Sequence, residues 1–364
     1  MTRVRVVAVD DSPIFLEVLR EVLEADGDIE VVAEAPDGRR ALDQVARHGP
    51  DLVTLDLNMP GQDGLATLEE LMALRPVPVV VLTSQPVKGA RDLVYEATRR
   101  GALEVLDKRM VCGASEENAR LRELARQLSA VSVVRHLRPW RRAPASLPSP
   151  SHTSYRSQVS QVSHSSQAPT CPVLALGASA GGPPALAHVL SELSADLPAC
   201  VAVVQHLCPG FAESFARFLQ DHTALRVRTV SERAPVEPGL VLLPPDGRHL
   251  VAVDRRHFAA SDAAPARGFR PAVDVLFSSV ARVHGAAAVG ALLTGMGDDG
   301  ARGLLELRRA GAATFAQDER TSVVFGMPRA ALESGAAARA VALGDLAVAL
   351  SEAVARTTLE RPAP

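Results

Sequence analysis

The sequence is poor in cysteine and in aromatic residues. Its 364 residues include four cysteines, and aromatic residues make up 3% of the chain. Four cysteines are too few for a disulfide scaffold in a chain this long, and no two of them form the C-x-x-C pair of a cysteine zinc site. With so few aromatic residues, the hydrophobic cores must be built mainly from Ala, Val and Leu.

Neither sign of charge is in large excess, and long apolar runs are lacking. The formal net charge is −3, from 39 Lys and Arg against 42 Asp and Glu. Such a chain has no surplus of cations to neutralise phosphates, so we expect no binding of nucleic acid. Asp10 and Asp11 end the first apolar run too early for a secretory signal, and residues 283–297 contain four glycines and are too short to span a bilayer. We therefore expect a soluble, cytoplasmic protein without membrane insertion.

A segment rich in serine and proline divides the chain. Residues 139–170 contain nine Ser and five Pro but no Asp or Glu. Such a segment has no apolar face to bury, so its packing cannot offset the entropy of ordering it. We predict a first domain over residues 1–134, a flexible linker over 135–170 and a second domain over 171–364. Trp140 in the linker either docks on a domain or is simply exposed.

Both predicted domains alternate short apolar runs with helical patterns, which is typical of parallel α/β sheets. In the first domain we expect strands at 4–9, 29–35, 52–55, 79–82 and 104–106, and helices at 14–25, 39–47, 65–74, 90–99 and 116–128. This pattern predicts a five-stranded parallel sheet of the flavodoxin-like type. In the second domain we expect strands at 173–176, 201–204, 240–243, 250–253, 287–293 and 313–316, and helices at 185–193, 211–220, 273–283 and 303–309. These elements predict a doubly wound, mostly parallel α/β fold.

Polar side chains follow four strands of the first domain. Asp10 and Asp11 come after the first strand, Asp56 after the third, Thr83 after the fourth and Lys108 after the fifth. The carboxyl ends of parallel strands share one edge of a sheet, where the three carboxylates would suit a divalent cation and the hydroxyl and ammonium an anion. A carboxylate at a strand end can also be a helix cap, as Asp11 before Ser-Pro could be. Five such residues together favour the functional interpretation.

These residues, with Asp56 inside LDLNMPGQDG at 55–64, resemble the receiver domain of two-component response regulators over residues 3–130. The resemblance implies that Asp56 accepts a phosphoryl group from a sensor histidine kinase, with Thr83 and Lys108 contacting the phosphoryl group. It also implies that Asp10, Asp11, Asp56 and the backbone carbonyl of Asn58 hold Mg²⁺.

Two positions depart from the receiver pattern. Val105 stands where receivers usually carry an aromatic residue, and Arg109 stands where Lys108 is usually followed by Pro. The departures concern the relay of phosphorylation rather than its chemistry.

The second domain has a glycine-rich turn after its first strand, GASAGGP at 177–183, which would present Ser179 at the edge of a sheet. The same turn could be a cradle for an anion or a plain tight turn. His206 ends the next strong strand, and Asp298 and Asp299 follow the strand at 287–293. If these strands are parallel, Ser179, His206 and a carboxylate reach one crevice as nucleophile, base and orienting acid.

With these segments the second domain resembles the CheB family of chemotaxis protein-glutamate methylesterases over residues 172–355. The matching segments are GASAGG at 177–182, Gln205-His206, RPAVDVLF at 270–277, LTGMGDDGA at 293–301, QDE at 317–319 and VFGMPRA at 324–330. The order of receiver, linker and esterase is also that of the family. The resemblance implies that Ser179 is the nucleophile, His206 the base and Asp299 the orienting acid, with Asp298 the second choice. It implies Met296 N–H as an oxyanion donor, and Ala180 replaces a Thr common in the family.

The resemblance implies a hydrolase of methyl esters on glutamate side chains in the cytoplasmic helices of chemoreceptors, with release of methanol and deamidation of receptor glutamines. The hydrolysis needs no cofactor, and Mg²⁺ belongs to the receiver. We expect the receiver to cover the crevice until Asp56 is phosphorylated. Two other hypotheses are a phosphorylation-switched binding module with a relic hydrolase site, and an esterase for another methylated protein.

Overall fold

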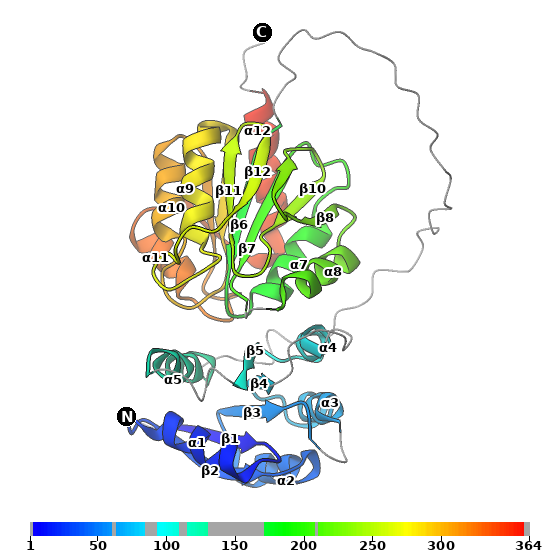
Figure 1. Ribbon diagram of the computed structural model, residues 1–364, viewed down its shortest axis with the longest axis vertical. Helices are drawn as coiled ribbons and strands as arrows, with labels where there is room; N and C mark the ends of the chain where they lie inside the picture. The colour runs from blue at the N-terminus through cyan, green and yellow to red at the C-terminus, as the bar shows by residue number, and fades with distance from the viewer. Residues whose placement is uncertain are drawn as a thin grey trace, which may run out of the picture.

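The computed structural model describes residues 3–59, 63–83, 93–108, 115–129, 171–207 and 210–359. The predicted linker, with Trp140, lies outside the described residues. Two bodies of α/β structure stand one above the other in Figure 1, the N-terminal one in blue and cyan and the C-terminal one in green to red.

The N-terminal body is a five-stranded parallel sheet with the strand order β2-β1-β3-β4-β5. The strands are β1 (Val4–Val9), β2 (Ile29–Ala35), β3 (Leu52–Asp56), β4 (Val79–Thr83) and β5 (Glu104–Asp107). The helices are α1 (Pro13–Glu24), α2 (Gly38–His48), α3 (Gly64–Leu74), α4 (Leu93–Arg99) and α5 (Ser115–Ser129). The prediction of a parallel flavodoxin-like sheet is confirmed, with strand bounds within a residue or two.

Helices cover both faces of this sheet, because alternate residues of its strands point to opposite sides. Val6 and Ala8 of β1 pack with α1 and α5, whereas Val7 and Val9 pack with α2, α3 and α4. This explains why the strands read as continuous apolar runs, with every residue of β3 and β4 buried.

The C-terminal body has a seven-stranded sheet with the order β15-β14-β13-β6-β7-β10-β8, in which every neighbouring pair is parallel. The strands are β6 (Val173–Ala178), β7 (Cys200–Gln205), β8 (Arg226–Thr229), β10 (Leu240–Leu243), β13 (Ala288–Leu292), β14 (Ala313–Gln317) and β15 (Arg339–Val341). The helices are α7 (Gly182–Glu192), α8 (Ala212–His222), α9 (Val273–His284), α10 (Ala301–Arg309), α11 (Met327–Glu333) and α12 (Leu343–Leu359), with a 3-10 turn η2 (Gly285–Ala287).

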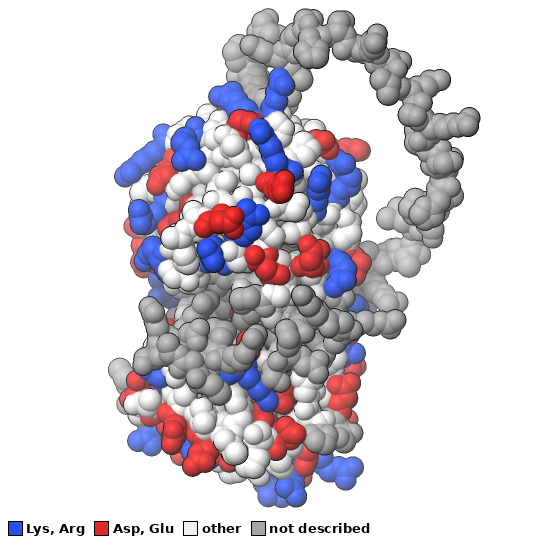
Figure 2. Space-filling model, viewed as in Figure 1, with Lys and Arg blue, Asp and Glu red and all other residues white. Residues whose placement is uncertain are grey.

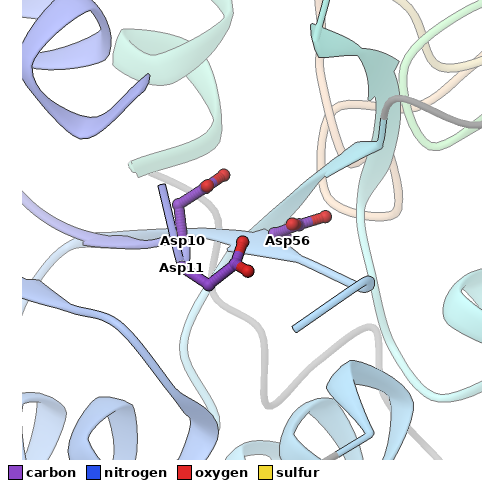
Figure 3. Close-up of side chains that lie close together, drawn as sticks. All are labelled: Asp10, Asp11 and Asp56. Atoms are coloured by element: carbon purple, nitrogen blue, oxygen red, sulfur yellow. The ribbon is translucent and has the colours of Figure 1, made fainter. Parts of the chain in front are cut away.

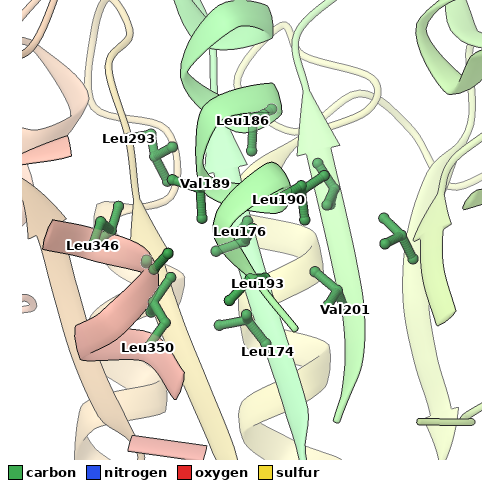
Figure 4. Packing of buried hydrophobic residues seen from close by; sticks show 14 of the residues in the cluster. Leu174, Leu176, Leu186, Val189, Leu190, Leu193, Val201, Leu293, Leu346 and Leu350 are labelled. Atoms are coloured by element: carbon green, nitrogen blue, oxygen red, sulfur yellow. The ribbon is translucent and has the colours of Figure 1, made fainter. Parts of the chain in front are cut away.

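The seven-stranded sheet also carries helices on both faces, which confirms the doubly wound prediction. Leu174 and Leu176 of β6 pack against α7, α8 and α12, as Figure 4 shows for the side chains around Leu186 and Leu350. Val173 and Ala175 point to the opposite layer of α9, α10 and α11. The two layers leave the carboxyl ends of the central strands β13, β6 and β7 together at one edge.

One predicted strand lies in a different sheet from the one expected. Residues 250–253 belong to β11 (His249–Asp254), which pairs antiparallel with β12 (His257–Ser261), and β12 pairs antiparallel with β9 (Arg233–Pro235). This three-stranded sheet packs on the α9 side, where Leu250 and Phe258 are fully buried. The predicted fold class of the second domain is therefore confirmed, but residues 250–253 are not part of the wound sheet.

The two bodies share an apolar contact. Leu121 and Leu124 of α5 belong to one buried cluster with Ala180 and Val324 of the C-terminal body. In Figure 1, α5, β5 and α4 lie on the side of the first body that faces the second. The first body therefore lies against the loops that follow the C-terminal strands.

The surface carries both signs of charge. On the face seen in Figure 2, acidic and basic side chains are interspersed over both bodies, in keeping with the net charge of −3. Among the described residues, none of the helices combines the length and the apolarity that crossing a membrane requires.

Candidate functional site

Three neighbouring parallel strands bring Ser179, His206 and Asp299 to the same edge of the second sheet. Ser179 directly follows β6, and His206 directly follows β7. Asp299 lies in the loop between β13 and α10. Because β6 pairs in parallel with both β7 and β13, the three loops meet, as the sequence predicted. All three residues are buried.

His206 and Asp299 form a short, buried contact. Nε2 of His206 lies 2.7 Å from Oδ2 of Asp299. The other ring nitrogen, Nδ1, is buried and has no hydrogen-bond partner among the described residues. The carboxylate thus fixes the proton on Nε2 and leaves the lone pair of Nδ1 for proton transfer. Ser179 and His206 line the same cavity.

Asp299 also caps the N-terminus of helix α9. Its carboxylate accepts the backbone N–H groups of Val273 (2.7 Å) and Asp274 (3.0 Å), which begin α9. Asp274 in turn accepts the N–H groups of Gly300 (3.0 Å) and Gly303 (2.8 Å) at the start of α10. Asp299 therefore caps α9, which contains Asp274, and Asp274 caps α10, which follows Asp299. The backbone N–H groups at the start of a helix have no acceptor within the helix, and these two carboxylates accept them.

This arrangement keeps Asp299 ionised. Burial alone would raise its pKa, but the hydrogen bond from His206 and the backbone N–H groups together hold the pKa of Asp299 below its ordinary value. Asp298, the second choice, is about half exposed and pairs with Arg267 at 2.7 Å. The geometry therefore favours Asp299 as the orienting acid.

The turn that presents Ser179 requires glycine. Gly181 has φ +71°, and a Cβ there would lie 2.5 Å from Cβ of Val323. Within the turn, Ser179 N–H donates to Thr294 O (3.0 Å), and Gly182 N–H donates to Ser179 O (2.8 Å). The amides of Ser179 and Gly182 are therefore bonded within the protein and do not point to an anion.

Two supporting residues were not expected to have roles. The buried side chain of Gln205 donates to the carbonyls of both Ser179 (2.8 Å) and His206 (2.9 Å). The buried hydroxyl of Thr294 donates to Ala180 O (2.9 Å) and accepts Val324 N–H (2.9 Å). Gln205 is the last residue of β7 and Thr294 follows β13. Both lie within the matching segments 205–206 and 293–301, so the sequence held a signal for them.

Met296, the expected oxyanion donor, lies beside the nucleophile and lines its cavity. The neighbouring N–H of Gly295 is taken by Val324 O (3.0 Å), and that of Gly326 by Gly295 O (3.1 Å). Within the described chain, no acceptor takes the N–H of Met296. A Cβ on Gly295 would lie 2.8 Å from Cβ of Ser179, so the loop passes directly over the nucleophile.

The cavity around Ser179 is closed by residues of both bodies and has a volume of about 290 Å³. From the first body, β5 and α5 contribute Glu104, Leu106, Leu121 and Leu124. From the second body come Ser179, Ala180, Gln205, His206, Leu207, Ala212, Phe215, Leu243, Pro244, Pro245, Asp246, Gly247, Gly268, Phe269, Arg270, Pro271 and Met296. The first body thus covers Ser179 and His206.

The acidic residues of the first body also meet as predicted. Ligand oxygens of Asp10, Asp11 and Asp56 lie within 4.8 Å of one another, and Figure 3 shows the three carboxylates at the strand ends. Nζ of Lys108 lies 2.6 Å from Asp10 Oδ2 and 2.8 Å from Asp56 Oδ2. The side-chain amide of Asn58 donates to Thr83 Oγ1 at 3.3 Å.

The charges of this cluster fit a divalent cation. Burial raises the pKa of Asp10, against the lowering effect of Lys108. Burial would lower the pKa of Lys108, but Asp10 and Asp56 outweigh it and the pKa is raised. Lys108 thus contacts two of the three carboxylates, so the cluster keeps an excess of negative charge. Hard oxygen ligands of this kind are those that Mg²⁺ prefers.

The two departures from the receiver pattern have different outcomes. Val105 is buried in the core with α2, α3 and α4, while its neighbour Leu106 lines the cavity over Ser179. The strand thus turns the smaller side chain inward. Arg109 lies outside the described residues.

Comparison with known proteins finds a family match for each of the two bodies. The family description "CheB methylesterase" matches residues 174–350, and "Response regulator receiver domain" matches residues 6–116. A protein-glutamate methylesterase/protein-glutamine glutaminase of Anaeromyxobacter dehalogenans is 41% identical over 96% of each chain. One of Xanthomonas euvesicatoria is 42% identical over 95% of this chain and 96% of its own. The crystal structure of the Thermotoga maritima CheB methylesterase catalytic domain has a TM-score of 0.48 and 32% identity, covering 50% of this chain and 98% of its own.

Proposed function

The chain belongs to the CheB methylesterase family, and we propose on that premise that it hydrolyses methyl esters of glutamate side chains on chemoreceptors and deamidates receptor glutamines. The observation that carries the proposal is the buried contact between His206 and Asp299, next to the cavity that His206 lines together with Ser179. The relatives' names give the substrate class.

The reaction proceeds through an acyl-enzyme. Ser179 Oγ attacks the ester carbonyl while Nδ1 of His206 takes the hydroxyl proton, and the same nitrogen then protonates the departing methanol. Asp299 stabilises the imidazolium that forms, and the N–H of Met296 donates to the oxyanion. Water repeats the sequence in the second half and releases the carboxylate. An amide substrate follows the same route with ammonia as the leaving group.

The first body receives the signal. We propose that a sensor histidine kinase transfers a phosphoryl group to Asp56, with Thr83 and Lys108 contacting the phosphoryl oxygens. Asp10, Asp11, Asp56 and the backbone carbonyl of Asn58 would hold Mg²⁺, which supplies charge neutralisation for the transfer. Since such a kinase draws on ATP, the proposal places the protein in the cytoplasm.

Phosphorylation would act on the cover of the cavity. Leu106, which lines the cavity, is two residues from Lys108, which contacts Asp56 at 2.8 Å. A phosphoryl group on Oδ2 of Asp56 would displace Lys108 from its present contact, and β5 would carry that displacement to the cover. We propose that the covered arrangement is the low-activity state and that phosphorylation opens it.

The test is methanol release from methylated receptor fragments, with mass spectrometry of the same peptides. The full chain with a phosphodonor and Mg²⁺ is expected to remove methyl groups and convert glutamine to glutamate, and Ser179→Ala is expected to do neither. Release by Ser179→Ala at the wild-type rate would refute the mechanism. A wild-type chain inactive on receptors but active on another methylated protein would change the substrate, and unchanged cellular output with Ser179→Ala would favour a binding module.

A further inference from the structure

An aromatic ring lies flat against the proposed catalytic base. The rings of Phe269 and His206 are stacked, with centroids 4.1 Å apart and planes inclined by 8°. The hydrogen bond between Asp299 and the imidazole is made at Nε2. A single hydrogen bond leaves the ring free to rotate about the line that joins the two groups. A flat partner on one face removes that freedom, because rotation would break the stacking contact.

The loop that carries Phe269 is itself fixed in several ways. Ala266 and Phe269 exchange two backbone hydrogen bonds, each 3.0 Å long. Between them Arg267 reaches Asp298, the residue next to the orienting acid, at 2.7 Å. The hairpin therefore holds the phenyl ring over the triad without help from a substrate.

Both ends of this loop, residues 264–272, are bound to one buried histidine. Nε2 of His249 lies 3.2 Å from Ala264 O, and Nδ1 accepts Ala272 N–H at 3.2 Å. His249 is fully buried. Ala272 immediately precedes α9, whose first amides bind Asp299. The same structure thus places the ring above His206 and the carboxylate beside it.

We propose that Phe269 is a positioning residue, which fixes the plane of the His206 imidazole so that Nδ1 faces Ser179. The inference rests on the proposed function, since it assigns His206 the role of base. Phe269 also lines the cavity, so the competing explanation is that it only contacts substrate. The two differ in their kinetics: a positioning residue acts on kcat, whereas a ground-state contact acts on KM.

The experiment measures the rate at which a small probe reacts with Ser179, which reports on His206 as base without a receptor substrate. A fluorophosphonate probe reacts at an activated serine: the Ser179 Oγ–P bond forms, the P–F bond breaks, fluoride leaves and the hydroxyl proton passes to His206. The full chain is labelled with Mg²⁺ and a small-molecule phosphodonor, and methanol release is measured in parallel. The variants are Phe269→Leu, which keeps an apolar side chain but loses the flat ring, and Phe269→Tyr, which keeps the ring.

The control is another pair of a phenylalanine and a histidine. Phe218 contacts the ring of His222 at 4.4 Å between centroids, within α8, with the planes inclined by 48°, and it is more deeply buried than Phe269. Phe218→Leu therefore tests for the general effect of losing such a ring. Circular dichroism melts of all variants show whether each is folded at the assay temperature.

We expect Phe269→Leu to slow labelling of Ser179 and to lower kcat by about threefold to tenfold, the range that corresponds to a stacked aromatic pair, with KM unchanged. Phe269→Tyr and Phe218→Leu should stay within about twofold of the wild type. Wild-type labelling by a folded Phe269→Leu chain, or a rise in KM alone, overturns the inference and leaves the proposed function standing. A wild-type chain that the probe does not label at Ser179 overturns both.

Discussion

The cover of the active-site cavity can be tested at one side chain of α5. Leu124 is 6% exposed, lines the cavity with Ser179 and belongs to a cluster that includes Ala180. Truncation of a buried Leu to Ala costs roughly 2–5 kcal/mol. Leu124 also packs within its own domain, so only part of that free energy comes from the contact that holds the first body over the cavity.

If about 1.4 kcal/mol of the cost falls on the cover, the equilibrium between covered and open cavity shifts about tenfold. Leu124→Ala should therefore raise methanol release by about tenfold in the absence of a phosphodonor. The rate with a phosphodonor should stay near that of the wild type, because the cavity is then already open. The ratio of stimulated to basal rate falls by the same factor.

The matched control is Leu128→Ala, one turn further along α5. Leu128 is fully buried in the same cluster but does not line the cavity. It should destabilise the first domain about as much as Leu124→Ala and leave the basal rate unchanged. A basal rate in Leu124→Ala equal to that of the wild type would refute the cover. An equal rise in both variants would assign the effect to the stability of the receiver instead.

Three further predictions concern single carboxylates. Asp299→Asn should lower kcat by about 10⁴-fold, whereas Asp298→Asn should have little effect, as steady-state methanol release would show. Asp56→Asn, or removal of Mg²⁺ by EDTA, should abolish the response to a phosphodonor and leave the basal rate unchanged; a variant that still incorporates phosphate would contradict this. Because the pKa of Asp299 is lowered in the folded state despite burial, its stabilising effect is complete above its unfolded pKa of about 3.9 and is lost as the pH falls through the folded value. Urea melts of wild type and Asp299→Asn should therefore differ near neutral pH and converge in acid.

The central strands of both domains could be predicted from the sequence, but the edges of the second sheet could not. Strands such as β1 and β6 are covered on both faces and read as apolar runs. The outermost strands of the second sheet are β8 and β15, and each is short and partly exposed. Such strands carry little apolar signal, so the sequence did not indicate them.

The antiparallel sheet shows a related limit. β11 was expected as a strand because its residues are apolar, but its partners β12 and β9 were not. A parallel sheet and a hairpin give the same pattern in a single short strand, and only pairing between distant residues separates them. The expectation of one wound sheet failed for this reason.

The candidate triad could be predicted because its members follow apolar strands, a local signal that the sheet converts into proximity. Ser179, His206 and Asp299 each have that signal. Phe269 differs in kind, because its contact with His206 depends on how the loop of residues 264–272 crosses the strand ends. A phenylalanine in a loop has no pattern that distinguishes a partner for an imidazole from an ordinary apolar contact.

The shared capping by Asp274 and Asp299 bears on how this protein could be engineered. Removal of a catalytic residue often stabilises an enzyme, since such residues are chosen for reactivity rather than for the fold. Here the orienting acid also holds the first turn of α9 through two backbone amides. An inactive variant made by substitution of Asp299 would be less stable than the wild type. An inactive variant that still binds receptors is therefore better made at Ser179, whose side chain caps no helix. In this fold, substitution of Asp299 lowers the catalytic activity and the stability of the protein together.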